Sequence, residues 1–406
     1  MNSPVKVGFL NRQGNLFSEI HFMSKKFDFY SIDAARIGFD LSFPNNYSLP
    51  EIESPDIFLL DSTFYSAIER LSDTETGLLF ERLRKLSKLG KIVVADGRDQ
   101  FALNYPPKIY AHADVILKTN GVFKDKELYN YATGALSPSK LWGQKVELKP
   151  PSERYSSTIL DKIKLSYPCM LALVPRVRAK ARAVLGFTKK DRLTRYAGDM
   201  ALQATTRVLN RLDLPRAANL PLFIGALNHI QRLEMIEMLT QTNVQGHYKI
   251  AGAKKNMIWG TEYGKQKLPD AVVEQIYGRA NELSLTSPKL SKAAYMLLLR
   301  KYLFILSPVG YGELCFRHGE AWQNQRVLVC QDLSHVEMML PIVHNENALF
   351  CKSDFSDLPK LIRDAQAGKY NLRAIQAEGY NRWNSFVRDL DSVLYQGFEK
   401  HVLEIL

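Results

Sequence analysis

The chain has 406 residues, 46% of them hydrophobic and 24% charged, which is the composition of a folded globular protein and excludes a disordered one. Single hydrophobic cores stop growing at roughly 250–300 residues, so the length predicts two domains. The formal net charge of +12 predicts anionic partners: nucleotides, phosphorylated acceptors, nucleic acid or an acidic membrane surface.

The first half alternates strands with helices. Short apolar runs predict strands at residues 5–10, 55–60, 91–96 and 113–119. Leucines at helical spacing, closed by Gly90, predict a helix over residues 74–89. Strands separated by helices imply a parallel sheet with helices on both of its faces.

Residues 134–217 interrupt this pattern with irregular, proline-containing chain and a strongly basic stretch. The stretch, residues 176–195, contains eight basic residues and a single acid, Asp191. Two interpretations stay open: a solvated helix or linker, and a patch for an anionic membrane or a phosphate-bearing acceptor. The second predicts a peripheral contact with the inner membrane face. No run of about 18 apolar residues and no signal-peptide pattern are present, so we expect a cytoplasmic protein.

The alternation restarts at Leu220. Strands are predicted at residues 220–227, 247–252, 302–306, 326–332 and 348–354. Helices are predicted at residues 231–240, 270–283, 291–300, 313–323 and 356–367, with one or two amphipathic helices over 372–406. Two doubly wound domains in series place a ligand in the crevice between them, at the carboxyl ends of the strands.

Residues 306–332 form the most informative segment. A strand ends here, a turn with Ser307, Gly310 and Gly312 follows, and a helix is expected to open with Glu313. A helix N-terminus offers free N–H groups and a positive dipole end, and both suit phosphate. The alternative is an ordinary glycine turn before a helix with paired surface charges. Neither a Walker loop nor a GxGxxG fingerprint is present, so no nicotinamide cofactor is indicated.

This segment resembles the donor-site signature of GT-B glycosyltransferases, especially exostosin-like and related bacterial sugar transferases. Those chains carry a strand, the pattern S-P-x-G-x-G, a helix with an arginine and a Glu-Ala pair, and another strand. Here the pair is Glu320-Ala321, and residues 223–239, 332–337 and 354–358 are also similar. The resemblance covers roughly residues 220–367.

The resemblance implies an α/β fold with two Rossmann-like domains facing each other across a cleft. It implies a donor site in the C-terminal domain, no cofactor, no essential metal ion and a terminal helix that crosses back to the first domain. We accordingly predict an acceptor-side domain at 1–217 with a basic insert around 174–195, a nucleotide-sugar domain at 218–375, and C-terminal helices at 376–406.

Carried over by position, the motif assigns donor contacts to individual residues. Arg317 would hold the donor phosphates and Glu320 the ribose, with Arg232 as a second phosphate candidate. The remaining donor-site candidates are Gly225, Ser307, Gly310, Gly312, Glu313 and His335, the last touching the donor sugar or the cleft. Retaining members often show two glutamates separated by seven residues, whereas Glu313 and Glu320 are separated by six, which favours inversion.

An inverting transferase needs a base that takes the acceptor proton. Asp96 and Asp99 follow a predicted strand of the first domain, where the cleft should lie; Asp61 and His112 are alternatives. Asp96 with Gly97 could equally form a turn, and Asp61 could cap a helix. His229 follows a strand of the second domain and is more simply explained as structural.

The four cysteines, Cys169, Cys315, Cys330 and Cys351, are widely spaced and contain no CxxC pair. They predict neither a metal cluster nor a disulfide framework, and apolar neighbours predict inert core thiols.

The sequence therefore predicts a glycosyltransferase that moves a sugar from a nucleotide-sugar donor to a hydroxyl of a glycan or glycolipid acceptor, in bacterial surface polysaccharide or lipopolysaccharide synthesis. The alternatives are a non-catalytic binder of anionic surfaces and a sugar-nucleotide epimerase of similar fold. No nucleic-acid partner is expected, because no recognised nucleic-acid motif is present.

Overall fold

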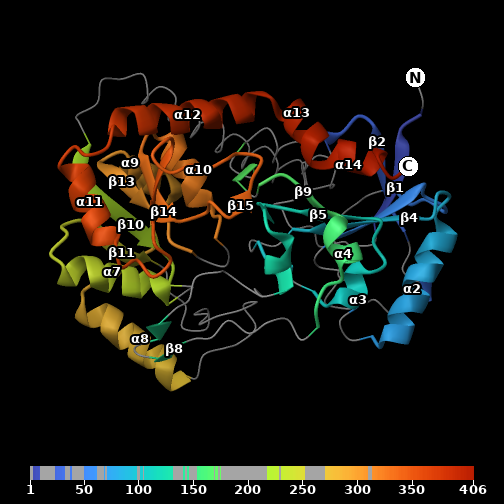
Figure 1. The fold of residues 1–406 in the computed structure, drawn as a ribbon, viewed down its shortest axis with the longest axis horizontal. Coiled ribbons are helices and arrows are strands. Elements are labelled where there is room, and N and C mark those ends of the chain that lie inside the picture. The colour runs from blue at the N-terminus through green and yellow to red at the C-terminus, as the bar shows by residue number, and fades with distance from the viewer. Residues whose placement is uncertain are drawn as a thin grey trace.

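The computed structural model of the chain contains two parallel six-stranded sheets, one in each half (Figure 1). The residues that it describes are 3–9, 23–32, 37–38, 50–61, 68, 71–97, 101–103, 105–130, 140–141, 144–145, 153–168, 170–171, 174, 217–227, 230–251, 270–309 and 313–406. Helices pack around both sheets, so the α/β architecture expected from the alternating apolar runs is confirmed.

The N-terminal sheet has the strand order β2-β1-β3-β4-β5-β9, and all its pairings are parallel. Its strands are β1 (Val5–Phe9), β2 (Phe27–Ser31), β3 (Ile57–Asp61), β4 (Lys91–Asp96), β5 (Val115–Lys118) and β9 (Ile163–Leu165). Its helices are α2 (Asp73–Leu86), α3 (Pro107–Tyr110) and α4 (Ser157–Asp161), with a 3₁₀ turn at Lys126–Asn130. A reciprocal capping box between Ser72 and Glu75 fixes the start of α2.

The C-terminal sheet has the order β12-β11-β10-β13-β14-β16, again with parallel pairings. Its strands are β10 (Ala218–Gly225), β11 (His247–Ala251), β12 (Thr286–Ser287), β13 (Tyr302–Leu306), β14 (Val327–Gln331) and β16 (Ala348–Cys351). If these six strands are numbered from 1 to 6 along the chain, their order in the sheet is 3-2-1-4-5-6. The order therefore reverses direction between β10 and β13. Ligands of doubly wound sheets bind at this point of reversal.

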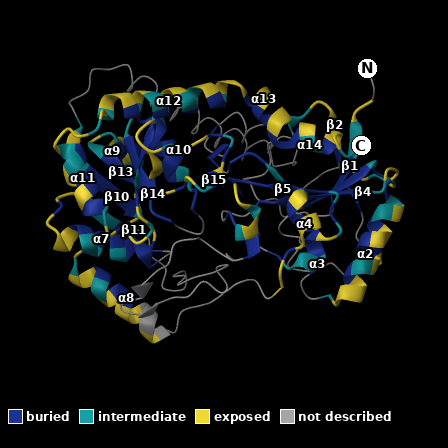
Figure 2. Cartoon of the chain, viewed as in Figure 1, coloured by how far each residue is buried: buried dark blue, intermediate teal, exposed yellow. Residues whose placement is uncertain are grey.

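Five helices accompany the C-terminal sheet: α7 (Gln231–Gln241), α8 (Asp270–Glu282), α9 (Lys292–Leu299), α10 (Phe316–Gln323) and α11 (Leu358–Gln366). The buried side chains lie in the strands and on the inward helix faces, and the exposed residues lie on the outer helix faces (Figure 2). One cluster of buried apolar side chains extends over both sheets, and a second lies within the C-terminal half.

Among the described residues, a pair of short strands and the C-terminal segment join the halves. β6 (Val122–Phe123) pairs antiparallel with β15 (Val336–Glu337), so each half supplies one strand of a two-stranded ribbon. The C-terminal segment runs along one side of both halves as α12 (Leu372–Arg388), α13 (Leu390–Leu394), a π-helical stretch Tyr395–Glu399 and α14 (Lys400–Leu403) (Figure 1). A short hairpin, β7 (Lys140–Leu141) with β8 (Gln144–Lys145), completes the described elements.

The structure differs from the predicted elements in two respects. Three strands of the two six-stranded sheets were not predicted, β2, β9 and β12, which are short or carry apolar residues only at alternate positions. The two-residue strands β6, β7, β8 and β15 were not predicted either. Helix α10 begins at Phe316 rather than at Glu313, because Cys315 is extended and its N–H donates to the His318 side chain. Glu313 therefore lies in the loop before the helix, not on one helical face with Glu320.

Within the described ranges, no helix is both long and apolar enough to span a bilayer. The basic stretch at 176–195 lies outside those ranges, so its two interpretations stay predictions.

Candidate functional site

The loops that follow the carboxyl ends of the two sheets meet each other. The Phe101 N–H, beyond β4, donates to Glu313 Oε2, beyond β13, at 3.2 Å. The Lys124 ammonium, beyond β6, donates to the Ser334 carbonyl at 2.7 Å. Both sheets therefore point their strand ends at a shared junction, where side chains from both domains can reach one ligand.

Gly225 ends β10 at the point where the strand order reverses. A Cβ atom here would lie 2.5 Å from Nη2 of Arg317, so the missing side chain leaves the space that the guanidinium occupies. Ser307, at the end of β13, is buried, and its hydroxyl lies 3.1 Å from both Cys315 Sγ and His318 Nδ1. Their predicted donor contacts are untested, but both residues shape the predicted site.

Arg317 lies in the first turn of α10, and its side chain extends to the point between β10 and β13 where the strand order reverses. Its Nη2 donates to the Ile224 carbonyl at 3.0 Å, and its guanidinium lies 4.9 Å from the centre of the Phe223 ring. Only 9% of the residue is exposed. Among the described residues, neither Nε nor Nη1 of Arg317 has a hydrogen-bond partner. A buried cation with two unused donors is suited to an anion that supplies the missing acceptors.

Glu320 lies almost one turn further along α10 and is also buried. It forms an ion pair with Lys292, the first residue of α9. Burial, together with the charge of Glu320, raises the pKa of Tyr295, so this hydroxyl stays protonated. Lys292 and Tyr295 are thus part of the same polar cluster as Glu320 and Arg317, although no sequence motif pointed to them.

Arg232, the second phosphate candidate, is engaged differently. Its Nε donates to the Val309 carbonyl at 3.1 Å and its Nη1 to the Ala226 carbonyl at 2.6 Å. These bonds join the loop after β10 to the loop after β13. The geometry favours Arg232 as a brace that holds the two loops together rather than as a phosphate ligand.

A polar pocket of about 550 Å³ opens beside the carboxyl ends of β14 and β16. Glu313 and His335 line it together with Asp332, Lys352 and Asp354. The His335 ring stacks on Phe123 of the other domain with 6.0 Å between centroids, and burial lowers its pKa. Its Nε2 has no partner among the described residues. A neutral imidazole therefore lines a pocket large enough for a sugar.

Asp96, one of the two predicted bases, is fully buried. It accepts a 2.6 Å hydrogen bond from the Tyr110 hydroxyl and pairs at 3.2 Å with the equally buried Lys118. A carboxylate enclosed in this way is poorly placed to take a proton from an acceptor, and the structure favours a structural role. Asp99 lies outside the described residues, as do His229, Gly310 and Gly312, and their roles stay predictions.

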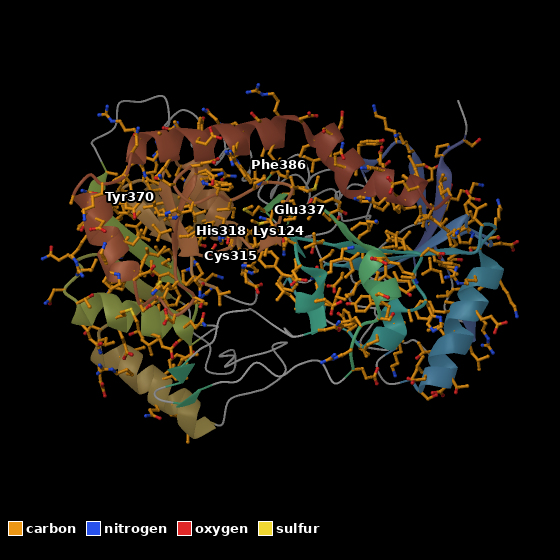
Figure 3. All side chains as sticks on the ribbon, viewed as in Figure 1. Lys124, Cys315, His318, Glu337, Tyr370 and Phe386 are labelled. Carbon is orange, nitrogen blue, oxygen red and sulfur yellow. The ribbon has the colours of Figure 1, made fainter. Side chains whose placement is uncertain are left out.

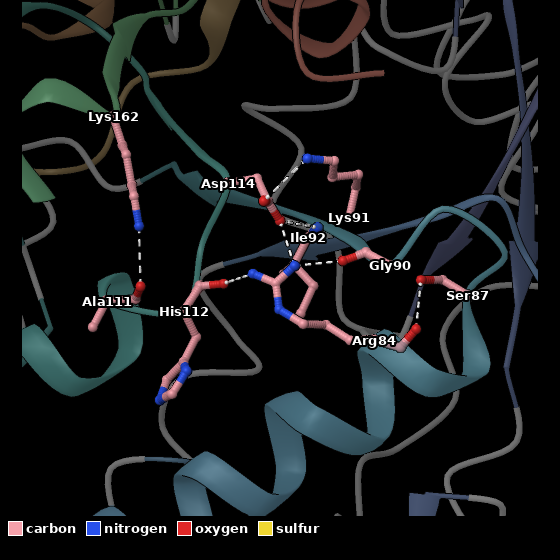
Figure 4. Close-up of polar contacts among 9 residues, drawn as sticks. All are labelled: Arg84, Ser87, Gly90, Lys91, Ile92, Ala111, His112, Asp114 and Lys162. Carbon is pink, nitrogen blue, oxygen red and sulfur yellow. Dashed lines mark hydrogen bonds and ion pairs between the residues drawn. The ribbon is translucent and has the colours of Figure 1, made fainter. Parts of the chain in front are cut away.

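The alternative base His112 lies at the wrong edge of the sheet. It precedes β5, beside a polar network around Arg84 that joins α2 to the amino ends of β4 and β5 (Figure 4). Its ring stacks on Phe80 at 4.7 Å. Because the cleft lies at the carboxyl ends, His112 cannot reach it. Asp61, by contrast, ends β3 at the carboxyl edge.

Of the three cysteines that the structure describes, one lies outside the core where all four were predicted; Cys169 is not among the described residues. Cys315 is half-buried at the start of α10, close to His318 (Figure 3). Its sulfur also contacts the Ser307 hydroxyl. Cys330 and Cys351 are buried, and burial raises the pKa of both, as expected of inert thiols. The sequence held a signal that was overlooked: Cys315 and His318 are three residues apart at a helix start, the spacing of a capping pair.

Neither a protein-family model nor a curated protein matches this sequence. Similar solved structures include a glycosyltransferase from Rickettsia africae, with 11% identity, a TM-score of 0.48 and coverage of 100% of this chain and 99% of that one. Anabaena HepE in complex with UDP-glucose has 11% identity, a TM-score of 0.46 and coverages of 99% and 100%. An α,α-trehalose-phosphate synthase from Burkholderia vietnamiensis has 12% identity, a TM-score of 0.47 and coverages of 100% and 98%.

Proposed function

We propose that this protein is a glycosyltransferase that uses a nucleotide-sugar donor. One observation carries the proposal: Arg317 is buried at the reversal point of the C-terminal sheet with two donor nitrogens that no described residue satisfies. A diphosphate supplies both the negative charge and the paired oxygens that such a guanidinium lacks. Gly225 supports this role, because its missing side chain gives Arg317 its place.

The neighbours of Arg317 are the candidates for binding the ribose and the sugar of the donor. Glu320 is the candidate for the two ribose hydroxyls, with Lys292 and Tyr295 fixing its orientation. The sugar would occupy the polar pocket with Glu313 and His335, which begins at the adjacent strand ends. Carboxylates and a neutral imidazole are the usual partners of sugar hydroxyls, since each can accept a hydrogen bond.

The proposed reaction is an attack by an acceptor hydroxyl on the anomeric carbon. The bond to the diphosphate breaks, and the diphosphate keeps the electron pair while Arg317, in place of a metal ion, neutralises the developing charge. A base must take the hydroxyl proton. Asp99 is the better candidate of the original pair, because Asp96 is tied to Lys118 and Tyr110.

We also propose that the acceptor is a glycan or glycolipid of a bacterial surface polymer at the inner membrane face. Support comes from the net charge of +12 and the basic stretch at 176–195. Wild-type protein should bind vesicles containing phosphatidylglycerol at low salt, and release them as salt rises. Equal binding to purely zwitterionic vesicles would remove the membrane from the proposal.

The donor site is tested by isothermal titration of wild-type protein with UDP, GDP, CMP and ADP. One nucleotide should bind, and Arg317→Gln should weaken it about 10- to 100-fold, because a charge-assisted bond contributes about 1.5–3 kcal/mol. Gly225→Ala should weaken it as well, since the new methyl group displaces Arg317. Arg363→Ala, an exposed arginine on α11, is the matched control and should bind like wild type.

Two results would overturn the proposal. Absence of binding by all four nucleotides at millimolar concentration would leave Arg317 without its predicted ligand. Conversion of the nucleotide sugar to its epimer without an acceptor would indicate an epimerase of similar fold, whereas a transferase would at most hydrolyse the donor slowly.

A further inference from the structure

Three side chains with labile protons meet at the start of α10. Cys315 Sγ lies 3.1 Å from the Ser307 hydroxyl and 3.6 Å from His318 Nδ1. The Cys315 N–H also donates to that Nδ1 at 3.2 Å. Ser307 and His318 are 1% and 0% exposed, whereas Cys315 is only half-buried. Cys315 is therefore the most exposed residue of the cluster.

Positive charge surrounds this thiol. It stands at the N-terminal end of the eight-residue helix α10, where the helix dipole favours a negative charge. Arg317 lies two residues further on, buried, with Nε and Nη1 unpaired among the described residues. His318 Nε2 is also buried, and no described residue pairs with it. Glu320 and Tyr295 lie near the Arg317 guanidinium as well, and its charge also acts on the Cys315 sulfur.

The electrostatics agree with this geometry. Burial by itself would raise the pKa of the Cys315 thiol, but the charge and hydrogen bond of His318, the charge of Arg317 and the Ser307 hydroxyl outweigh it. Together they lower the pKa of Cys315 to about 5. At neutral pH the group is then a thiolate, which is the nucleophilic form of cysteine. Cys330 and Cys351 have raised pKa values and stay protonated.

We propose that Cys315 is a site of covalent modification by small electrophiles, with anionic electrophiles preferred, and that its modification closes the donor site. The modification site is argued from the cluster alone, whereas the closure of the donor site rests on the proposed function. In the reaction the sulfur attacks the electrophilic carbon, a carbon–sulfur bond forms, and the leaving group departs with its electron pair. No proton is released, because the attacking species is already the thiolate.

The position of the sulfur explains why modification of Cys315 would close the donor site. Cys315 directly precedes the first residue of α10, and Arg317, the proposed phosphate ligand, is the second residue of the same helix. A group attached to the sulfur projects into the space at this helix start. If it is a carboxylate, it also pairs with the guanidinium that the donor diphosphate needs.

The test uses the full-length protein at pH 6 with iodoacetate and, separately, iodoacetamide. Mass spectrometry of the proteolysed chain gives the alkylation rate of each cysteine. Cys315 should react at least about 100-fold faster than Cys330 and Cys351, since its thiolate fraction is larger by more than that factor. The ratio of the iodoacetate rate to the iodoacetamide rate at Cys315 should fall several-fold in Arg317→Gln. Arg317→Lys and Arg363→Ala should keep it.

Each outcome has one meaning. Similar rates at Cys315, Cys330 and Cys351 in folded protein would overturn the modification site. An unchanged reagent ratio in Arg317→Gln would overturn the preference for anions. If the bound nucleotide fails to slow alkylation, or carboxymethylated protein still binds it, closure of the site is wrong while the proposed function stands. If no nucleotide binds the unmodified protein, the proposed function fails and the reactivity of Cys315 is unaffected.

Discussion

Two arginines lie over the same phenylalanine ring and differ in how many of their donors are used. Arg232 and Arg317 approach Phe223 at 5.9 and 4.9 Å. Arg232 donates to two loop carbonyls, whereas Arg317 donates to the Ile224 carbonyl, interacts with Tyr295 and keeps two buried nitrogens without a described partner. At this scale, the number of donor nitrogens without a hydrogen-bond partner distinguishes a ligand-binding arginine from a structural one.

This difference predicts opposite effects of the same substitution. Arg232→Met should lower the free energy of unfolding by about 1–3 kcal/mol, because two buried carbonyls lose their donors. Arg317→Met should change it by less than about 1 kcal/mol without nucleotide, because it removes a cation that is incompletely paired. Urea unfolding followed by tryptophan fluorescence measures both. Equal destabilisation would mean that Arg317 is held for structural reasons.

His112 predicts part of the pH dependence of stability. Burial, together with the charges of Arg84 and Lys162, lowers its pKa below the usual 6.5. The unfolded chain then binds more protons than the folded one, so this contribution is complete above pH 6.5 and is lost as pH falls through the lowered pKa. Wild-type stability should therefore fall between pH 7 and about 5, and His112→Gln should fall less. Identical slopes in urea titrations of the two proteins would refute this.

At the scale of elements, two glycines within helices differ in whether the packing of neighbouring side chains requires the glycine. Gly379 lies in α12, where a Cβ atom would come within 2.3 Å of Cδ1 of the buried Trp322, whose ring N–H is anchored on the Asn347 carbonyl. Gly278 lies in α8 with no atom within 4 Å of such a Cβ. The first glycine is required by a helix contact, and the second is not.

The same Gly→Ala change should therefore have opposite signs in the two helices. Gly379→Ala should destabilise the protein by about 1–3 kcal/mol, since Trp322 cannot move without breaking its hydrogen bond. Gly278→Ala should stabilise it by about 0.5–1 kcal/mol through helix propensity. Melting temperatures from calorimetry decide the signs. A stabilising Gly379→Ala would show that α12 does not pack on α10 as described.

At the scale of the whole molecule, the C-terminal segment ties the two domains together. The Phe398 ring meets Phe27 edge to face at 5.1 Å, and Glu399 accepts from Ser24 at 2.6 Å and pairs with Lys26 at 3.1 Å. The Ser166 hydroxyl donates to the Gly397 carbonyl at 2.8 Å. These contacts attach the end of the chain to the first domain, beside its two edge strands β2 and β9.

Removing the Phe398 side chain should loosen this attachment. Phe398→Ala should cost about 3–5 kcal/mol, as expected for a buried phenylalanine. Tyr395→Ala is the matched control, because Tyr395 is 41% exposed and should cost less than about 1 kcal/mol. Limited proteolysis should cleave near residue 398 faster in the first variant only. Equal cleavage of both variants and wild type would contradict a coupling role for this segment.

The sequence by itself determined the two-sheet α/β organisation, and a local motif predicted the location of the candidate site. Apolar runs and helical repeats are local patterns, and a local pattern suffices to predict a strand, a helix or a parallel alternation of the two. The turn after β13 and the arginine in the next helix are also adjacent in the sequence. Short strands such as β12, with its two residues, gave no such signal.

Only the tertiary structure decided what the individual polar residues do. Asp96 and Lys118 are 22 positions apart and form a buried pair, and Arg317 reaches the Ile224 carbonyl across 93 positions. The strand order brings such groups together, and burial then fixes which of them stay charged, paired or free to bind a ligand. Neither can be read from neighbours along the chain, because both depend on neighbours in space.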